Sequence, residues 1–232
     1  MKLLYEGKAK KVYEVDKDKC LIYFKDTATA FDATKKAEVE GKGILNNAIS
    51  SLLFKLLEEK GVKTHFIERV SEREMLVWRA KRLDLEVVVR NITAGSICKR
   101  LGFKEGEKLK KPLVEFFYKN DQLHDPLICI EHAVLLNIAD KRTLKDIVKI
   151  ALKVNTILKS FFKSHGLLLV DFKLEFGRLP EGTLAVIDEI SPDTCRLWDA
   201  KTGEKLDKDR FRFDLGDLLE GYKKVFERVQ GG

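Results

Sequence analysis

Residues 167–176, LLLVDFKLEF, join an apolar run to a strict alternation of charged and apolar residues. Successive side chains of a β-strand point to opposite faces, so a strand here separates three charged side chains from three apolar ones. The charged residues are Asp171, Lys173 and Glu175, and the apolar residues are Phe172, Leu174 and Phe176. The charged face is either the solvent side of an amphipathic strand or a site that holds a cation and an anion together.

A second apolar run, TLAVIDEI at 183–190, follows a Pro-Glu-Gly turn and also ends in acidic residues. If the two runs pair as a hairpin, Glu175 of the first approaches Asp188 of the second. Mg²⁺ takes few protein carboxylates and completes its coordination with phosphate oxygens and water, so this pair suits a magnesium–nucleotide site. The alternative is an exposed, ion-paired surface, which contributes little to stability.

Three further segments carry basic residues that suit an anion. Lys8 and Lys10 lie in the glycine turn GKAK, which is either a phosphate cradle or a basic hairpin turn. Arg90 follows a β-rich run, and Ser96 begins a predicted short helix whose free N–H groups favour an anion; the alternative is an ordinary helix cap beside a surface arginine. Arg196 lies in a proline-containing loop, where it either grips a phosphate or stacks on the nearby tryptophan.

The polar segment KNDQLHDP at 119–126 contains Lys119 and Asp125, a composition that suits a turn or a polar substrate site. The phosphate-loop pattern GxxxxGK[ST] does not occur in the chain. The four cysteines are widely spaced and form no CxxC pair, which favours reduced, structural thiols over a zinc site or a disulfide framework.

The order of the predicted elements indicates an α+β chain of two lobes. β-rich runs dominate to about residue 92 and mixed helices and strands follow, so the boundary is expected near residues 85–95. Helices are predicted over 43–60, 96–101, 143–164 and 215–229. Gly61 is expected to cap the end of the first helix, and Thr143 is expected to cap the start of the third.

A formal net charge of +7 predicts an anionic partner, either a nucleic acid or a phosphorylated small molecule. The lysines are spread along the chain among acidic residues, with no basic tail, which favours a small anion in a cleft. No run approaches the roughly 18 consecutive apolar residues of a membrane helix. The N-terminus has too short an apolar segment for a signal peptide, so a cytoplasmic protein without a membrane partner is expected.

Two long segments together resemble one family closely, phosphoribosylaminoimidazole-succinocarboxamide synthase, or SAICAR synthetase. LVDFKLEFG at 169–177 is similar to one family signature without a mismatch, and LEVVVRNITAGS at 85–96 is similar to the other. Shorter blocks resemble the family in the same order, namely YEGKAKKVYE, KNDQLHDP, DEISPDTCRLWD and DKDRFR. The resemblance covers nearly the whole chain.

The resemblance implies a small β-rich, kinase-like N-terminal lobe over a larger α+β, ATP-grasp-like lobe, with ATP in the cleft between them. Residues 1–85 are the expected nucleotide-binding lobe, and residues 86–232 are the expected substrate- and metal-binding lobe. The implied enzyme is an ATP- and Mg²⁺-dependent ligase of de novo purine biosynthesis. It joins 5-amino-1-(5-phosphoribosyl)imidazole-4-carboxylate (CAIR) to L-aspartate through an acyl phosphate and releases SAICAR, ADP and phosphate. A homodimer without a nucleic-acid partner is the implied assembly.

The resemblance also implies a role for each candidate residue. For ATP these are Lys8 and Lys10 at the phosphates, Val12 packed on the nucleotide, and Glu86 at the adenine. For the ribonucleotide phosphate they are Arg90, Ser96 and Arg196, and further substrate-side positions are Asp32, Lys119 and Asp125. Glu175 and Asp188 are the implied Mg²⁺ ligands. Lys173 and Asp171 are the implied catalytic residues, because Lys173 neutralises the reacting carboxylate and Asp171 orients it.

Two residues depart from the family pattern. Cys195 stands where many relatives carry serine, which weakens a hydroxyl contact to phosphate there, and Asp84 stands where the family usually has proline. Two alternatives remain: a related ATP-dependent kinase or ligase acting on another phosphorylated carboxylate, and a basic nucleic-acid-binding protein. The second alternative leaves the charged face of residues 171–175 unexplained.

Overall fold

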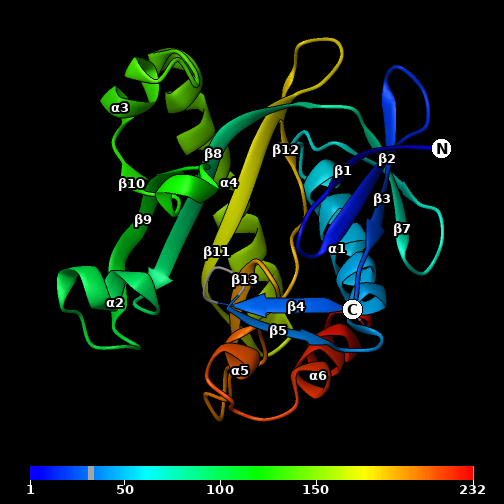
Figure 1. Ribbon diagram of the computed structural model, residues 1–232. Coiled ribbons are helices and arrows are strands. Elements are labelled where there is room, and N and C mark those ends of the chain that lie inside the picture. The colour runs from blue at the N-terminus through cyan, green and yellow to red at the C-terminus, as the bar shows by residue number, and fades with distance from the viewer. Residues whose placement is uncertain (31–33, 232) are drawn as a thin grey trace.

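The computed structural model describes residues 1–30 and 34–231. It places a small antiparallel sheet beside a larger one, with helices packed against both sheets (Figure 1). The α+β architecture predicted from the order of the elements is therefore confirmed. Within the described residues, none of the helices combines the length and apolarity that a membrane span requires.

In the described part of the chain, the N-terminal sheet has five antiparallel strands in the order β1–β2–β3–β7–β6. The strands in that order span Lys2–Glu6, Lys10–Glu14, Lys19–Phe24, Glu74–Trp78 and Phe66–Arg69. A separate ribbon joins β4 (Thr27–Ala30) to β5 (Lys35–Glu38). The strands on both sides of Gly7 were predicted, whereas the two four-residue strands of the ribbon were not.

Helix α1 (Lys42–Glu59) packs against the N-terminal sheet and against the last helix, α6 (Leu218–Gln230). Lys60 caps the end of α1, and Gly61 follows it with a φ of 70°, so Gly61, the predicted cap, lies one residue beyond the observed one. α6 begins three residues later than predicted, because the Asp217 side chain accepts the backbone N–H of Leu219 at 2.8 Å and so caps the helix there.

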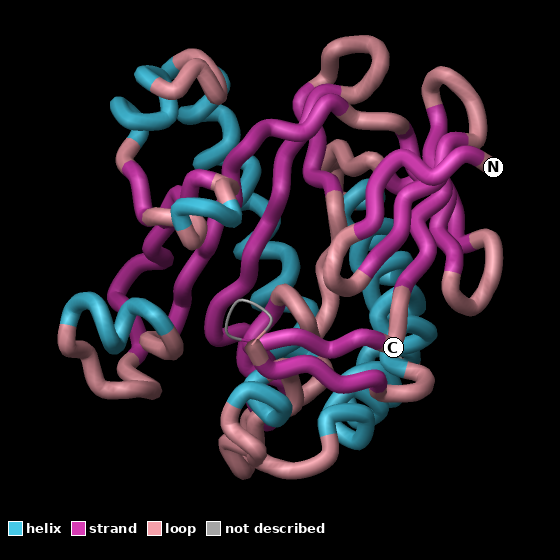
Figure 2. The backbone as a smooth tube through the Cα atoms, in the orientation of Figure 1, coloured by secondary structure: helices cyan, strands magenta, loops and turns pink. Residues whose placement is uncertain are grey.

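The central sheet is antiparallel and, within the described residues, has six strands. The path β10–β9–β8–β11–β12 spans Leu127–Ile128, Lys108–Tyr118, Lys81–Ile92, Leu167–Arg178 and Leu184–Ile187, and β13 (Cys195–Asp199) also pairs with β11. β8 follows one edge of β11, while β13 and β12 share the other edge. Strands β8, β12 and β13 therefore all pair with β11, whose long extended course crosses the molecule (Figure 2).

Helix α4 (Lys141–Ser164) covers one face of the central sheet by packing against β11, β8 and β9. Its fully buried apolar residues recur every three or four positions, which is the period of a helix with one apolar face. They are Leu144, Ile147, Ala151, Val154, Leu158 and Phe162. The cap that begins α4 is Asp140 and not Thr143, because the Asp140 carboxylate accepts the Thr143 N–H at 2.7 Å. The helix therefore starts before the predicted cap.

The remaining helices are short. They are α2 (Ser96–Leu101), α3 (Ile130–Leu135), α5 (Asp209–Arg212) and the 3₁₀ turn Asp121–Leu123. The α2 boundaries are those predicted from the sequence. Arg196, predicted to lie in a loop, lies on strand β13 instead, and this strand pairs with the first half of β11.

Candidate active site

Strand β11 places its charged and apolar residues on opposite faces, as the alternation predicted. Phe172, Leu174 and Phe176 enter the core with at most 1% of their surface exposed. Asp171 and Glu175 are also buried, at 3% and 6% exposure. The charged face is therefore not an ordinary solvent face, because buried carboxylates require compensating partners.

The hairpin of β11 and β12 brings Glu175 and Asp188 together. Glu175 pairs with Ile187 across the hairpin, and Asp188 is the next residue along the chain. Burial and then the negative charge of Asp188 raise the pKa of Glu175. Asp188 has a φ of 75°, in the left-handed region that residues other than glycine seldom adopt. Such strained conformations are frequent at functional sites.

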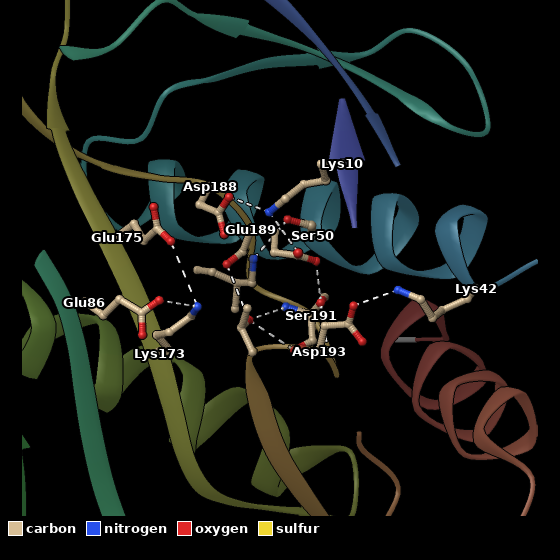
Figure 3. A network of polar contacts seen from close by, with 12 residues as sticks. Lys10, Lys42, Ser50, Glu86, Lys173, Glu175, Asp188, Glu189, Ser191 and Asp193 are labelled. Atoms are coloured by element: carbon tan, nitrogen blue, oxygen red, sulfur yellow. Dashed lines mark hydrogen bonds and ion pairs between the residues drawn. The ribbon is translucent and has the colours of Figure 1, made fainter. Parts of the chain in front are cut away.

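Three lysines neutralise these acids, and we call the group the lysine–carboxylate cluster. Its members are Lys10, Glu86, Lys119, Lys173, Glu175, Asp188 and Glu189. Lys10 reaches from β2 of the N-terminal sheet to hydrogen-bond Asp188, and its Nζ lies 2.9 Å from Glu189 Oε1 (Figure 3). The cluster therefore ties the two sheets together through a side chain of the GKAK turn.

Lys173 contacts one acid on the neighbouring strand β8 and one on its own strand β11. Its Nζ lies 2.8 Å from Glu86 Oε1 and 4.0 Å from Glu175 Oε1 (Figure 3). Burial acts to lower the pKa of Lys173, but the charges of Glu86 and Glu175 outweigh it and raise the pKa above the usual lysine value. Lys173 is therefore a fixed ammonium near neutral pH, able to neutralise an anion but not to act as a base.

Lys119 and Lys10 complete the charge balance of the cluster. Lys119 Nζ lies 3.0 Å from Glu175 and 3.2 Å from Glu86. Although burial opposes it, the charges of Lys10 and Lys173 lower the pKa of Asp188 to about 2. Asp188 is therefore ionised at neutral pH, as a metal ligand needs to be.

Next to the cluster lies a cavity of about 320 Å³, which we call the arginine cavity. Lys173 and Glu86 belong to both, and the other charged side chains of the lining are Arg90, Asp171, Asp193, Arg196, Lys208 and Arg212. Arg90 on β8 and Arg196 on β13 flank Asp171 on β11, with guanidinium nitrogens 2.8 and 3.0 Å from its Oδ2. The pairing of the three strands thereby places two guanidinium groups beside the Asp171 carboxylate.

The loop into α2 adds Ser96 to this group. Arg90 Nη2 donates to Ser96 Oγ at 3.0 Å. Gly95, immediately before it, has a φ of 63°, and a Cβ atom there would lie 2.4 Å from Arg196 Nη2. Only glycine leaves room for the guanidinium at this point. The three residues predicted to bind a phosphate, Arg90, Ser96 and Arg196, thus line one cavity.

Comparison with known proteins agrees with this geometry. A sequence model of the SAICAR synthetase family matches residues 3–229. The chain belongs to the SAICAR synthetase family. The phosphoribosylaminoimidazole-succinocarboxamide synthase of Persephonella marina is 59% identical over 228 residues, 98% of this chain and 95% of that protein. The one from Aquifex aeolicus is 63% identical over 202 residues, 87% of this chain and 94% of that protein.

Solved structures of the family have the same fold. A SAICAR synthetase (Type-2) in complex with ADP superposes with a TM-score of 0.96 at 55% identity, covering 98% of this chain and 97% of that one. The phosphoribosylaminoimidazole-succinocarboxamide synthase of Ehrlichia chaffeensis superposes with a TM-score of 0.97 at 45% identity, covering 99% and 98%. The predicted SAICAR synthetase fold is confirmed.

Other residues that the family resemblance singled out lie around these two groups. The Lys8 side chain is half exposed, with its Nζ 3.9 Å from Asp121 Oδ1. Val12 is partly buried and packs on the hydrophobic core. Asp125 accepts the Asn120 N–H at 2.7 Å and so shapes the turn of the KNDQLHDP segment. Asp32 lies outside the described residues.

The two departures from the SAICAR synthetase pattern have different surroundings. Cys195 is buried, and burial raises the pKa of its thiol, so it is a neutral group at the wall of the arginine cavity. Asp84 is exposed and accepts a hydrogen bond from Arg82 at 3.0 Å. The replacement of proline therefore lies on the surface.

Sequence reasoning assigned no role to several buried residues of this SAICAR synthetase site. Glu115 on β9 accepts Arg90 Nε at 2.6 Å. Asp209 is fully buried and accepts Arg196 Nε at 2.9 Å and Arg212 Nη1 at 2.7 Å. Asp209 and Arg212 belong to the DKDRFR block, whose similarity to the family was the only signal for them. Glu115 gave no signal, because strand β9 itself was not predicted.

Proposed function

We propose that this chain is an ATP-dependent carbon–nitrogen ligase that joins CAIR and L-aspartate to form SAICAR, ADP and phosphate in purine biosynthesis. The observation that carries the proposal is the adjacency of two sites on β11. Arg90, Ser96 and Arg196 suit the phosphate of a ribonucleotide, and Lys173 lies in the same cavity, next to an acidic pair that suits a metal–nucleotide complex.

The proposed reaction has two steps. The CAIR carboxylate attacks the terminal phosphorus of ATP, giving an acyl phosphate and ADP; the amine of aspartate then attacks the acyl carbon and releases phosphate. Lys173 neutralises the reacting carboxylate. Asp171, fixed between Arg90 and Arg196, orients it. The protein supplies position and charge, which dominate catalysis of phosphoryl transfer, and no enzymic nucleophile is needed.

The N-terminal sheet supplies the proposed nucleotide contacts. Lys8 and Lys10 of the GKAK turn meet the phosphates, and Val12 packs on the base. Glu86 meets the adenine. Lys10 supports this assignment, because it already extends from the N-terminal sheet to the acidic pair. The relative solved in complex with ADP supports a nucleotide site in this fold.

Mg²⁺ is the proposed metal, with Glu175 and Asp188 as its protein ligands. Among residues 1–30 and 34–231, no group of three or more His, Cys, Asp and Glu side chains is arranged to hold a metal. Two adjacent carboxylates do fit Mg²⁺ when nucleotide phosphates supply further oxygens. A divalent cation here would relieve the repulsion that raises the pKa of Glu175. Its chemistry would be to neutralise the phosphates.

The substitution Asp188→Asn tests this metal site. We expect the Mg²⁺ concentration for half-maximal activity to rise at least about tenfold, the loss that even outer-sphere partners of a metal cause. The measurement is the initial rate against Mg²⁺ at fixed ATP, with Asp146→Asn on the surface of α4 as the control. A variant with lowered kcat but wild-type Mg²⁺ dependence would remove Asp188 from the metal site.

Phosphate release by the purified protein tests the overall function. Release should require ATP, Mg²⁺, CAIR and L-aspartate together, and chelation of the metal should abolish it. Release that is indifferent to aspartate contradicts the assignment and favours a kinase or ligase acting on another phosphorylated carboxylate. Binding to DNA or RNA that weakens steeply with salt is the result expected of a nucleic-acid-binding protein.

We propose two lobes, and the two sheets support this division. We assign residues 1–85 to a nucleotide-binding lobe and residues 86–232 to a substrate- and metal-binding lobe. The five-stranded sheet lies in the first range, and the central sheet lies mostly in the second, with β8 passing through the boundary.

A cytoplasmic homodimer without nucleic acid is the proposed assembly. Exposed apolar side chains on β10 and α3, Leu127 and Leu135, support a contact with a second copy. The cations of the arginine cavity have buried carboxylates beside them, which favours a small anion over a nucleic-acid backbone. Sedimentation at the mass of one chain would contradict the dimer.

A further inference from the structure

Two cations of the arginine cavity, Lys208 and Arg212, have no role in the reaction proposed above. Five basic side chains line the cavity, and four of them are paired with an acid. The pairs are Arg90 with Glu115, Lys173 with Glu86, Arg196 with Asp171, and Arg212 with Asp209. Among the partners available in residues 1–30 and 34–231, the fifth, Lys208, has neither an ion pair nor a side-chain hydrogen bond. Among the described residues, Lys208 is therefore the one cation of the lining without a direct acidic partner.

The acid that acts most strongly on Lys208 is already engaged. Asp193 also lines the cavity, but its Oδ2 lies 2.7 Å from Lys42 Nζ and its Oδ1 accepts the Tyr222 hydroxyl at 2.5 Å. Burial lowers the pKa of Lys208, although Asp193 acts in the opposite direction. An anionic ligand would give the Lys208 ammonium the direct hydrogen-bonded partner that it lacks among the described residues.

The backbones of Lys208 and Lys173 hydrogen-bond to the same short segment of the cavity wall. The backbone N–H of Lys208 donates to the Pro192 carbonyl at 3.1 Å. Two residues further along the chain, the Thr194 carbonyl accepts the Lys173 N–H at 2.9 Å. The segment 192–194 therefore lies between the two lysines, and a small molecule held at Lys208 lies beside the group held at Lys173.

We propose that Lys208, with Arg212 next to it, binds a carboxylate of the amino-acid substrate. The proposal rests on the proposed function and identifies where its second substrate is bound. A single cation without a direct ion-pair partner matches a carboxylate, which carries one negative charge. The phosphate dianion is matched by the separate group of Arg90, Ser96 and Arg196, which offers several donors. In an α-amino acid the amine and a carboxylate share one carbon, so binding here brings the amine towards the carboxyl group at Lys173.

Steady-state kinetics of Lys208→Met test the proposal. We expect the KM for L-aspartate to rise about 10- to 100-fold, the range for loss of a hydrogen bond to a charged group. The KM values for ATP and CAIR should stay within a factor of three. Lys208→Arg should recover part of the loss, and Lys201→Met, on an exposed turn, is the matched control. A merely structural role would not confine the change to one substrate.

Equilibrium binding separates this proposal from the proposed function. Titration calorimetry with L-aspartate, and with inorganic phosphate as the competing anion, needs no turnover. Weaker L-aspartate binding by the variant with unchanged phosphate binding supports the subsite, even if wild-type phosphate release proves independent of aspartate. Weaker phosphate binding with unchanged L-aspartate binding overturns it and moves Lys208 to the phosphate group.

The unfolding midpoint shows whether each variant is folded. Lys208 is one of the two cations that stabilise the Asp193 carboxylate, so the midpoint of Lys208→Met should fall, but the variant should still unfold in one cooperative transition. If methionine disturbs the fold, Lys208→Gln, which keeps a polar side chain of similar reach, replaces it in both measurements. Wild-type aspartate kinetics in a folded Lys208→Gln or Lys208→Met variant would overturn the proposal.

Discussion

Alanine at position 173 is expected to lower kcat by about 10²- to 10³-fold, the usual effect of removing one group that stabilises charge in a transition state. Lys173 is the basic residue shared by the lysine–carboxylate cluster and the arginine cavity. Because neighbouring acids raise its pKa, the lysine carries its charge throughout the working pH range. The loss should therefore be the same at every pH near neutrality.

The fold of Lys173→Ala should survive, because a second lysine compensates the same acids. Lys119 Nζ lies within 3.2 Å of both Glu86 and Glu175. Circular dichroism and the unfolding midpoint check this, and Lys149→Ala on the exposed face of α4 is the matched control. Turnover at the wild-type rate in folded Lys173→Ala would remove Lys173 from the reaction.

The strand periodicity was sufficient to predict the geometry of β11. An alternation of charged and apolar residues fixes which side chains share a face, whatever the strand packs against. It did not predict that the charged face is buried, since Asp171 depends on arginines from β8 and β13. Whether the charged face is buried or exposed depends on the pairing of Asp171 with arginines that lie about 25 and 80 residues away in the sequence.

Residues that act through such distant pairings had no local signal. Glu115 becomes a partner of Arg90 only because β9 pairs with β8, and Asp209 joins the site only because α5 lies beside β13. The helix cap at Asp140 is a different case. Asp140 and Thr143 both match cap preferences, and the side chain that accepts the free N–H decides between them. Similarity to a family signature located Arg90, Ser96 and Arg196, which periodicity alone left open.

The substitution Lys42→Met is expected to lower the free energy of unfolding by roughly 3–5 kcal/mol, the range for breaking a buried ion pair. The Lys42 side chain is fully buried, and that of its partner Asp193 is 4% exposed. Removing the lysine leaves Asp193 buried, with Tyr222 as its remaining hydrogen-bond donor in the described part of the chain. Urea unfolding at pH 7 measures the loss.

The pH dependence of that loss identifies its cause. Burial acts to raise the pKa of Asp193, but the charges of Lys208 and Lys42 outweigh it and hold the pKa well below the usual aspartate value. A lowered pKa in the folded state stabilises the protein above the unfolded value of about 3.9, and this stabilisation is lost as the pH falls further. The difference between wild type and Lys42→Met should therefore be complete at pH 7 and should shrink below about pH 4.

A double substitution separates the ion pair from simple packing. Methionine fills a volume similar to that of lysine, so a packing defect would persist when Asp193 is also changed. Lys42→Met combined with Asp193→Asn removes both charges and should recover part of the lost stability, because no uncompensated carboxylate remains. A double variant as unstable as the sum of the single ones would show that the two residues act independently. Coupling would show that Lys42 on α1 acts through Asp193, an aspartate of the cavity wall, so that this helix helps to hold the site in place.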